Sequence, residues 1–244
     1  MTAAPAAVIG GVEVLKYTAF AHSAEGGNPA GVVLGPGALE DPAMLAIAAE
    51  VGYSETAFIW PLDAPNSFRV RYFSPASEVP FCGHATIASG IALADHGVSG
   101  DIRLQTDSGE VVVGVGKDEA GRPMATLTSV TPQVAEVATA DLAEALASLG
   151  WTDDDLDPGL PPRVAYAGAY HLVLGVRSRQ CLADMRYEFE RLRVLMNARA
   201  WTTAELVWRA APLVFHARAP FPVGGVVEDP ATGAAAAAFG AYLR

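Results

Sequence analysis

Cysteine is scarce in this chain, with only Cys82 and Cys181 among 244 residues. Two cysteines in unrelated sequence contexts cannot form the disulfide framework on which small secreted domains depend. The N-terminal stretch MTAAPAAVIGGVEVLKY has no basic residue before Lys16 and carries Pro5, so it does not have the pattern of a secretory signal. We therefore expect a cytoplasmic protein whose thiols are reduced.

Long apolar runs and positive charge are lacking as well. No run of about 18 apolar residues is free of turn formers and charges, so no membrane-spanning helix is expected. The chain has 16 Lys and Arg against 27 Asp and Glu, a formal net charge of −11. Such a charge repels nucleic acid and anionic membranes, which excludes both as expected partners. An anionic small molecule would need a local cluster of hydrogen-bond donors.

Several common catalytic signatures are missing. The chain contains no G-x-G-x-x-G after a strand, no G-x-x-x-x-G-K-[ST], no H-E-x-x-H and no G-x-S-x-G. Dinucleotide-binding, P-loop, zinc-protease and hydrolase sites of these types are therefore not indicated. The spacing of histidines and cysteines is not that of a metal site either, and we predict no metal.

What the chain has is apolar residues and length. Hydrophobic residues make up 51% of the sequence and the mean hydropathy is +0.26, so a sizeable core can form and disorder is not expected. A length of 244 residues is long for one domain and suits two of about 100–150 residues each.

Two segments have the composition of a helix that is apolar or small on every side, residues 85–94 and residues 233–243. A helix without a polar face is expected to be buried all round. Strand-like runs surround each segment, with a boundary near residues 129–134. The sequence thus predicts two halves, each with strands around one buried helix, as a weak internal duplication with an offset of about 146–148 residues.

Each of these helices begins at a turn with a glycine, Gly83 or Gly233. The first amides of a helix have no partner within the helix and the helix dipole favours an anion there, so two such turns could hold a small carboxylate. Alternatively, each glycine simply allows its helix to pack tightly.

Four residues near these turns could carry chemistry, and each has a structural alternative. Glu55 in GYSETAF could be partly desolvated, which would raise its pKa toward the range useful for proton transfer, or it could be a solvated or capping residue. His84 could relay a proton or be a packed histidine. Asp229 could cap the second helix, and Cys82 could be a thiolate activated by the helix dipole.

Four ordered segments, NPAG (28–31), SETAFI (54–59), FSPASEVPFCGHATIA (73–88) and EDPATG (228–233), resemble the phenazine-biosynthesis PhzF-like proteins. The resemblance runs from about Val12 to the last residue. It implies the diaminopimelate epimerase-like α+β fold, with two similar domains, each a curved, mostly antiparallel sheet wrapped around a central buried helix. We expect these domains at residues 1–130 and 131–244, with the active site in the cleft between them.

The resemblance also implies a function. The chain would be a cofactor-independent isomerase of a small carboxylate, and a homodimer. Glu55 would be the general acid/base, and His84 and Asp229 would orient the substrate and help to move protons. The substrate would be bound by Asn28, Cys82, Gly83, Thr232, Gly233 and Ala234. Two alternatives stay open: an amino-acid or hydroxy-acid epimerase or dehydratase that uses Cys82, and a degenerate homologue that only binds a metabolite.

Three departures from the family pattern stand out. Ala234 occupies a position that is commonly serine, so one hydroxyl of the proposed anion site is missing. Pro230 is expected where the two-thiol epimerases carry their second cysteine, which disfavours two-thiol racemisation. Family members continue past the second helix, so the C-terminal domain looks truncated, and Phe239 and Leu243 are expected to need a cover from outside the chain.

Overall fold

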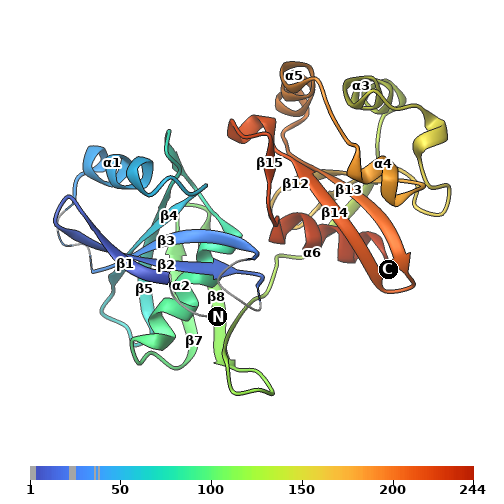
Figure 1. The fold of residues 1–244 in the computed structure, drawn as a ribbon. Helices are drawn as coiled ribbons and strands as arrows, with labels where there is room; N and C mark the ends of the chain where they lie inside the picture. Colours follow the sequence, from blue (N-terminus) through green and yellow to red (C-terminus); the bar gives the residue numbers. More distant parts are fainter. Residues whose placement is uncertain (1–3, 22–25, 36, 38) are drawn as a thin grey trace. The chain divides into compact units, whose positions relative to one another are not determined.

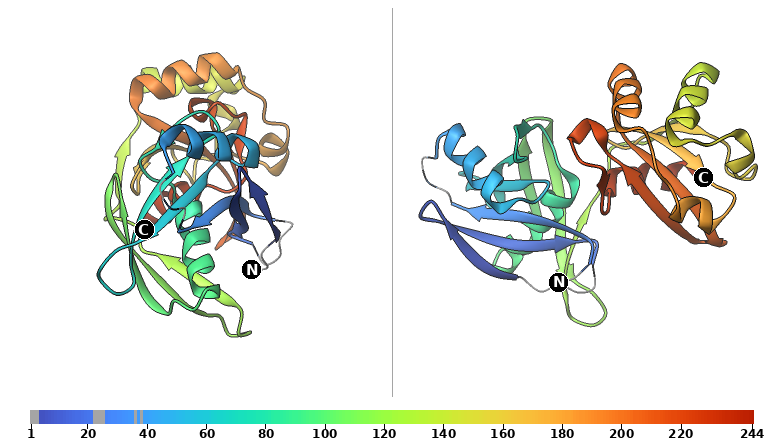
Figure 2. Two further views of the ribbon diagram at one scale, coloured as in Figure 1. Left: turned by 90° about the vertical axis from the view of Figure 1, so that its left-hand side faces the viewer. Right: turned by 45° about the horizontal axis from the view of Figure 1, so that its top comes forward.

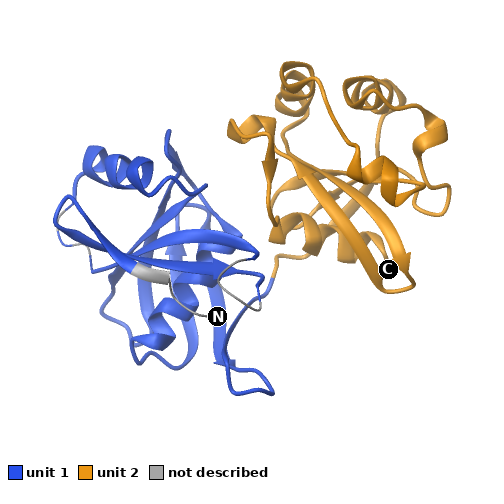
Figure 3. Cartoon of the chain, in the orientation of Figure 1, with its two compact units in different colours: residues 1–128 blue, residues 129–244 orange. Residues whose placement is uncertain are grey.

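The structure is a computed structural model that describes the chain except residues 1–3, 22–25, 36 and 38. The chain divides into two compact units, residues 1–128 and residues 129–244 (Figure 3). Within the described part of the chain, no helix combines the length and the apolarity needed to cross a bilayer.

The described residues of unit 1 form a nine-stranded sheet and two helices (Figure 1). The strand order is β1-β2-β3-β4-β5-β7-β8-β9, with β6 paired to β5. The β3–β4 and β5–β7 pairs are parallel and the other described pairs are antiparallel. The elements are β1 Ala4–Ile9, β2 Val12–Ala19, β3 Asn28–Leu34, α1 Asp41–Val51, β4 Thr56–Pro61, β5 Ser67–Phe73, β6 Glu78–Val79, α2 Gly83–Asp95, β7 Gly100–Thr106, β8 Gly109–Lys117 and β9 Pro123–Leu127.

Helices α1 and α2 cover opposite faces of this sheet (Figure 2). Successive side chains of a strand point to opposite faces. Val32 and Ala57 therefore join the core around α2, while their neighbours Val33 and Phe58 join the core beneath α1. Burial on both faces explains why β3 and β4 are apolar along almost their whole length. The expectation that the first all-apolar helix is buried is confirmed, since α2 is buried from His84 to Leu93 at all but one position.

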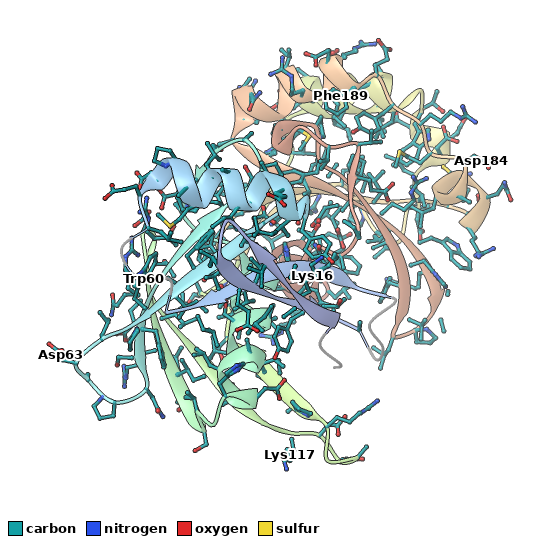
Figure 4. The ribbon with its side chains drawn as sticks, turned by 60° about the vertical axis from the view of Figure 1, so that its left-hand side comes forward. Lys16, Trp60, Asp63, Lys117, Asp184 and Phe189 are labelled. Carbon is teal, nitrogen blue, oxygen red and sulfur yellow. The ribbon has the colours of Figure 1, made fainter. Side chains whose placement is uncertain are left out.

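Side chains at the ends of the unit 1 strands are solvent-facing. Asp63, in the turn between β4 and β5, and Lys117, at the end of β8, both project outward from the sheet (Figure 4). Trp60 on β4 donates its ring N–H to the Gly37 carbonyl at 2.9 Å. These side chains lie at the periphery of the unit. Cys82, Gly83 and His84, which the sequence analysis singled out, lie at the N-terminal end of α2.

The described residues of unit 2 form a six-stranded sheet in the order β10-β11-β12-β13-β14-β15. The β12–β13 pair is parallel and the other described pairs are antiparallel. The elements are β10 Gln133–Glu136, α3 Thr139–Leu149, a 3₁₀ turn Asp153–Asp155, β11 Arg163–Tyr166, β12 Tyr170–Gly175, α4 Arg179–Ala183, α5 Phe189–Arg199, β13 Trp201–Ala211, β14 Val214–Pro220, a 3₁₀ turn Pro222–Gly224, β15 Glu228–Asp229 and α6 Gly233–Tyr242.

The unit 2 sheet also has both faces covered. Leu172 and Leu206 pack beneath α3, α4 and α5, while Val173 and Val207 pack against α6. Helices α3 and α5 run side by side (Figures 1 and 2) and are joined by a bidentate ion pair in which Arg191 Nε donates to Glu144 Oε1 at 2.6 Å. The predicted α+β class with mostly antiparallel sheets is confirmed.

Helix α6 departs from the prediction that it is buried all round. It buries Ala235, Ala238 and Phe239 but exposes Ala236, Ala237 and Gly240. Phe239 does not need a cover from outside the chain, because Phe215 on β14 packs edge-to-face on its ring with centroids 4.9 Å apart. Leu243, beyond the helix, is 41% exposed.

The two halves share one order of elements. In each, a strand leads through a helical crossover to a parallel strand, then to an antiparallel strand, a two-residue strand and the central helix. The predicted offset of 146–148 residues is wrong, because α2 begins at Gly83 and α6 at Gly233, which makes the offset 150. The position equivalent to Cys82 is therefore Thr232, and Pro230 does not occupy it.

Candidate active site

The turn before α2 presents an open helix N-terminus. Cys82 is the N-cap residue with an extended backbone, and its carbonyl accepts hydrogen bonds from the Thr86 amide at 3.0 Å and the Thr86 hydroxyl at 2.7 Å. Apart from its chain neighbours and the backbone of its own helix, no described atom lies within 4 Å of a Cβ built on Gly83. A glycine is thus not required there by protein packing, which favours the interpretation that Gly83 allows a ligand to approach the first amides of the helix.

Glu55 and His84 lie together at this turn. Glu55 precedes β4, and its Oε2 is 3.4 Å from His84 Nε2. Ser54 Oγ is 3.3 Å from the same nitrogen. The side chains of His84 and Glu55 are 7% and 13% exposed, so the pair is shielded from water but not sealed. This arrangement gives an imidazole and a carboxyl that can exchange a proton or share one with a bound molecule.

Cys82 also lies beside the imidazole. Its Sγ lies 3.3 Å from His84 Nδ1 and 4.0 Å from Nε2. When His84 Nε2–H donates to Glu55, Nδ1 is the acceptor for the Cys82 thiol, and a proton moved along this line would leave a thiolate beside an imidazolium. Among the described residues, the ligand atoms of Glu55, Cys82 and His84 lie within 4.8 Å of one another.

The segment that carries Glu55 is fixed by β3. Gly31, the last residue of NPAG, donates its amide to the Glu55 carbonyl at 3.2 Å. A Cβ at Gly31 would lie 2.6 Å from Thr56 Oγ1, so β3 and β4 can approach this closely only with glycine. The loop before Glu55 also contacts β2, because Lys16 Nζ on β2 lies 5.7 Å from the centre of the Tyr53 ring. Asn28, the first residue of β3, is 1% exposed and pairs with Ala19.

The remaining predicted residues form a second set, in unit 2. Asp229 on β15 accepts a hydrogen bond from Thr232 Oγ1 at 2.6 Å and is 9% exposed. Thr232 is the N-cap residue of α6, and Gly233 and Ala234 form its first turn. The predicted site residues thus fall into two sets: Glu55, Cys82, Gly83 and His84 with Asn28 in unit 1, and Asp229, Thr232, Gly233 and Ala234 in unit 2.

An arginine holds the strand before each turn. In unit 1, Arg71 donates to both oxygens of Glu78 at 2.6 Å, and in unit 2 Arg218 does the same to Glu228 at 2.9 and 2.6 Å. Arg218 Nη1 also donates to three backbone carbonyls between residues 182 and 185. Bidentate pairs of this kind fix orientation as well as distance.

The sequence analysis did not single out a buried polar group in unit 2. Glu205 on β13 is 4% exposed, and burial together with the nearby Asp229 raises its pKa to about 8. His171 Nδ1 lies 2.7 Å from Thr203 Oγ1, and burial lowers the pKa of His171 to about 4, so this histidine is neutral. An acid inside the apolar run AELVW is the signal that could have drawn attention to Glu205.

The row that contains Glu205 follows from the strand register. Leu206 pairs with Arg218 on β14, which places Glu205 opposite Ala219, and Ala219 pairs with Asp229 on β15. Glu205 and Asp229 therefore share one face of the sheet with only the small side chain of Ala219 between them. Two carboxyl groups in one buried place cannot both be ionised cheaply.

Comparisons with known proteins show the family of the chain. The phenazine biosynthesis-like protein family (PhzC-PhzF) matches residues 17–244. The uncharacterized isomerase YfhB of Bacillus subtilis is 36% identical over 241 residues, which are 95% of this chain and 80% of that protein. Among solved structures, a PhzF-family phenazine biosynthesis protein from Bacillus anthracis has a TM-score of 0.84 at 27% identity and covers 99% of this chain and 80% of its own.

A predicted epimerase from Pseudomonas aeruginosa is also similar, with a TM-score of 0.77 at 27% identity over 93% of this chain and 79% of that one. The family match covers both units and includes every residue of the two candidate sets. The chain belongs to the phenazine biosynthesis-like (PhzF) family.

Proposed function

We propose that the protein is a cofactor-independent isomerase that moves a proton within a small carboxylate substrate, with Glu55 as the general acid/base. Its relatives in the family carry the names of isomerases and epimerases. The single observation that carries the proposal is the position of Glu55 Oε2, 3.4 Å from His84 Nε2, beside a helix N-terminus whose first residue, Gly83, has open space next to it.

The proton transfer needs no electron donor or acceptor. The Glu55 carboxylate takes a proton from a substrate carbon next to a carbonyl or an unsaturated system, and the electron pair of the broken C–H bond enters that system. Glu55 then returns the proton to a different carbon. His84 holds the carboxylate in place and donates to the charge that develops on the substrate. A positioned acid/base of this kind contributes about 10²–10⁴ in rate.

Substrate binding would use the helix amides. In unit 1 a substrate carboxylate would accept hydrogen bonds from the amides at the start of α2, with Asn28 as a further binding residue. In unit 2 the turn formed by Thr232, Gly233 and Ala234, with Asp229 beside it, offers a second set of donors. Ala234 offers its amide but no hydroxyl. Helix N-termini bind anions through unpaired amides and the helix dipole, which supports a carboxylate at these turns.

The test is a screen for proton exchange. Small cyclic and aromatic carboxylates are incubated with the protein in D₂O, and incorporation of deuterium at carbon is followed by NMR. The proposal predicts that at least one of them exchanges and changes its pattern of double bonds. Carboxylates that bind without any exchange would instead support a degenerate, metabolite-binding homologue.

A second candidate uses Cys82 as the base, favoured by its Sγ lying 3.3 Å from His84 Nδ1. A two-thiol mechanism is disfavoured, because the equivalent position in unit 2 is Thr232. Once a substrate is known, Cys82→Ala separates the two candidates. We expect it to retain most of the activity, as should the control Cys181→Ala in unit 2. A loss with Cys82→Ala alone would favour the thiol route.

A further inference from the structure

The group formed by Glu55, Cys82 and His84 combines three different ligand types for a transition metal. It offers a carboxylate oxygen, a thiol sulfur and an imidazole nitrogen, all within 4.8 Å of one another. We propose that these three residues form a Zn²⁺-binding site whose occupation blocks proton transfer. The binding part stands on geometry alone, and the blocking part rests on the function proposed above.

The spacing of the three ligand atoms is close to that of a tetrahedral zinc site. Bonds of about 2.3 Å to sulfur and about 2.0–2.2 Å to nitrogen and oxygen imply ligand-to-ligand distances of about 3.3–3.6 Å. His84 Nε2 lies 3.4 Å from Glu55 Oε2 and 4.0 Å from Cys82 Sγ. Cys82 Sγ, which lies 3.3 Å from Nδ1, must therefore turn toward Nε2 for the three atoms to surround one ion. Three protein ligands leave a fourth position for water.

The backbone on both sides of the group is well fixed. Cys82 is the N-cap of α2 and its carbonyl is held by Thr86, while Gly31 holds the Glu55 carbonyl. The side chains of His84 and Glu55 are 7% and 13% exposed, and the whole Cys82 residue is 8% exposed. A site with little freedom and limited water loses little entropy when an ion binds.

The choice of ion follows from the ligands. Thiolate and imidazole select Zn²⁺ or Cu⁺ and disfavour Mg²⁺ and Ca²⁺, which prefer all-oxygen sites. Binding requires the thiol to lose its proton and the imidazole to be neutral, so the ion releases protons on binding and binds more tightly as pH rises.

Occupation of this site should inhibit the reaction. The ion would occupy the Glu55 lone pair that accepts the substrate proton and the His84 nitrogen that acts as a donor, so the metal-free protein is the active form. Unit 2 offers no equivalent, because Thr232 and Ala234 stand where Cys82 and His84 stand in unit 1. The proposed site is thus confined to one of the two central helices.

The experiment uses Co²⁺ as a spectroscopic probe for Zn²⁺. Full-length protein, freed of metal with a chelator, is titrated with Co²⁺ under reducing conditions. We expect one equivalent to produce thiolate-to-cobalt charge-transfer absorption in the near ultraviolet and d–d bands typical of tetrahedral coordination. Excess Zn²⁺ should abolish both. Absence of the charge-transfer band in the wild-type protein would overturn the proposal.

Matched variants locate the ion. Cys82→Ser should lose the charge-transfer band and weaken Zn²⁺ binding at least about 100-fold. Loss of a residue that only hydrogen-bonds to a metal ligand already lowers metal affinity by up to about 100-fold. Cys181→Ser should keep the band. Glu55→Gln keeps the thiolate, so it should retain the band but bind the metal ion more weakly. This variant tests the site if circular dichroism shows that Cys82→Ser does not fold. A band that survives Cys82→Ser and disappears in Cys181→Ser would refute the site.

The metal readout and the exchange readout fail independently. A cobalt band without any exchange activity would leave the metal site standing and count against the proposed function. Exchange activity without a cobalt band would support the proposed function and count against the metal site. If both are present, Zn²⁺ should suppress exchange and a chelator should restore it; a protein active only when loaded with Zn²⁺ would contradict the inhibitory role.

Discussion

The two central helices, α2 and α6, have the same place in the same order of elements but different surroundings and different polar residues. In unit 1, α2 is enclosed, and Gly90 faces Val113 on β8 and Ala125 on β9. In unit 2, the equivalent Gly240 is exposed and has no described atom within 4 Å of a built Cβ. The offset of 150 places these two glycines, like Gly83 and Gly233, at matching positions.

The elements that hold the two turns are duplicated more faithfully than the residues that could react. Arg71 with Glu78 and Arg218 with Glu228 form the same bidentate pair before the two helices. The reactive side chains differ, because His84 in unit 1 corresponds to Ala234 in unit 2. The comparison indicates that the duplicated backbone repeats the glycine-containing helix start and that, at the matching positions, only unit 1 places an imidazole in its turn.

Unit 2 has a different buried group instead. On β13, Glu205 precedes Leu206, the residue that pairs with Arg218. On β4, Ala57 precedes Phe58, the residue that pairs with Arg71. Ala57 is therefore the unit 1 equivalent of Glu205. Ala57 is part of the apolar core around α2, whereas Glu205 is a buried acid near Asp229. Substituting the residues that differ between the two units, one at a time, shows which of them affect activity and which affect stability.

The largest effect is expected at the position where the two turns differ most. His84→Gln removes the imidazole beside Glu55, so kcat should fall by about 10²–10³, within the range for a positioned proton-transfer group. The matched change in unit 2, Ala234→Ser, restores a hydroxyl and should lower KM by a few-fold, since one hydrogen bond is worth about 0.5–1.5 kcal/mol. Steady-state kinetics on the substrate found by the exchange screen check both. Equal effects of the two changes would show that the turns are not specialised.

The two arginines should differ in stability. Arg218→Gln leaves Glu228 without its partner and removes the donor of three carbonyls, so it should lower the free energy of unfolding by about 2–4 kcal/mol. Arg71→Gln should cost about 1–3 kcal/mol, because the Arg71–Glu78 pair is about as exposed as the Arg218–Glu228 pair, but its further partner, Asp41, is a surface carboxylate and not a set of backbone carbonyls. Urea unfolding measures both changes. A larger loss for Arg71→Gln would contradict the role given to the carbonyls.

The buried acid of unit 2 should make stability depend on pH. Folding raises the pKa of Glu205 to about 8 from 4.5, so its contribution is complete below about pH 4.5 and is lost as pH rises through 8. Folding lowers the pKa of His171 to about 4 from 6.5, so its contribution is lost as pH falls from 6.5 through 4. Of these two groups, Glu205 has the larger effect between pH 6.5 and 8, and it should lower stability by about 2 kcal/mol over this range.

The control for this pH dependence is Glu205→Gln, which keeps the shape and removes the titrating group. Urea unfolding at pH 6.5, 7.25 and 8 should show a flatter curve for this variant than for the wild-type protein. Asp229, the charged neighbour on β15, stays in place in both proteins. Parallel curves would mean that Glu205 does not hold a proton in the folded state.

The smallest effect is expected from alanine at the matching helix glycines. Gly240→Ala meets nothing and removes backbone freedom from the unfolded chain, so it should stabilise by about 0.5–1 kcal/mol. Gly90→Ala would bring its Cβ to 2.8 Å from Val113 Cγ1, and overpacking of this kind costs about 1–3 kcal/mol. Thermal unfolding of the two variants gives the sign of each. A destabilising Gly240→Ala would show that the exposed face of α6 is covered in solution.

The fold could be predicted from the sequence where local signals were strong. Asp41 and Pro42 at the start of α1 and Gly52 at its end are start and stop signals present in the sequence, and Gly52 adopts the left-handed conformation that ends a helix. Helix α3 was not predicted, although Gly150 ends it in the same way. The offset between the halves was misjudged because small residues surround both turns and give no unique register.

The site was only partly predictable. Glu55 and His84 are far apart in sequence and were connected only by the resemblance to a family, since their contact depends on how β4 and α2 pack. Glu205 was overlooked because strand patterns describe which face is apolar and do not say that an acid on that face will stay protonated. Only the register of β13, β14 and β15 brings Glu205 beside Asp229.

The central claim is that Glu55 moves the proton, and the rate of deuterium incorporation at the reacting carbon tests it most directly. Wild-type protein and Glu55→Gln are compared by NMR in D₂O at saturating substrate, with Glu50→Gln on the exposed side of α1 as the control. Glu55→Gln should slow exchange by about 10²–10⁴, and Glu50→Gln should exchange at the wild-type rate. Exchange at the wild-type rate in Glu55→Gln would contradict the central claim.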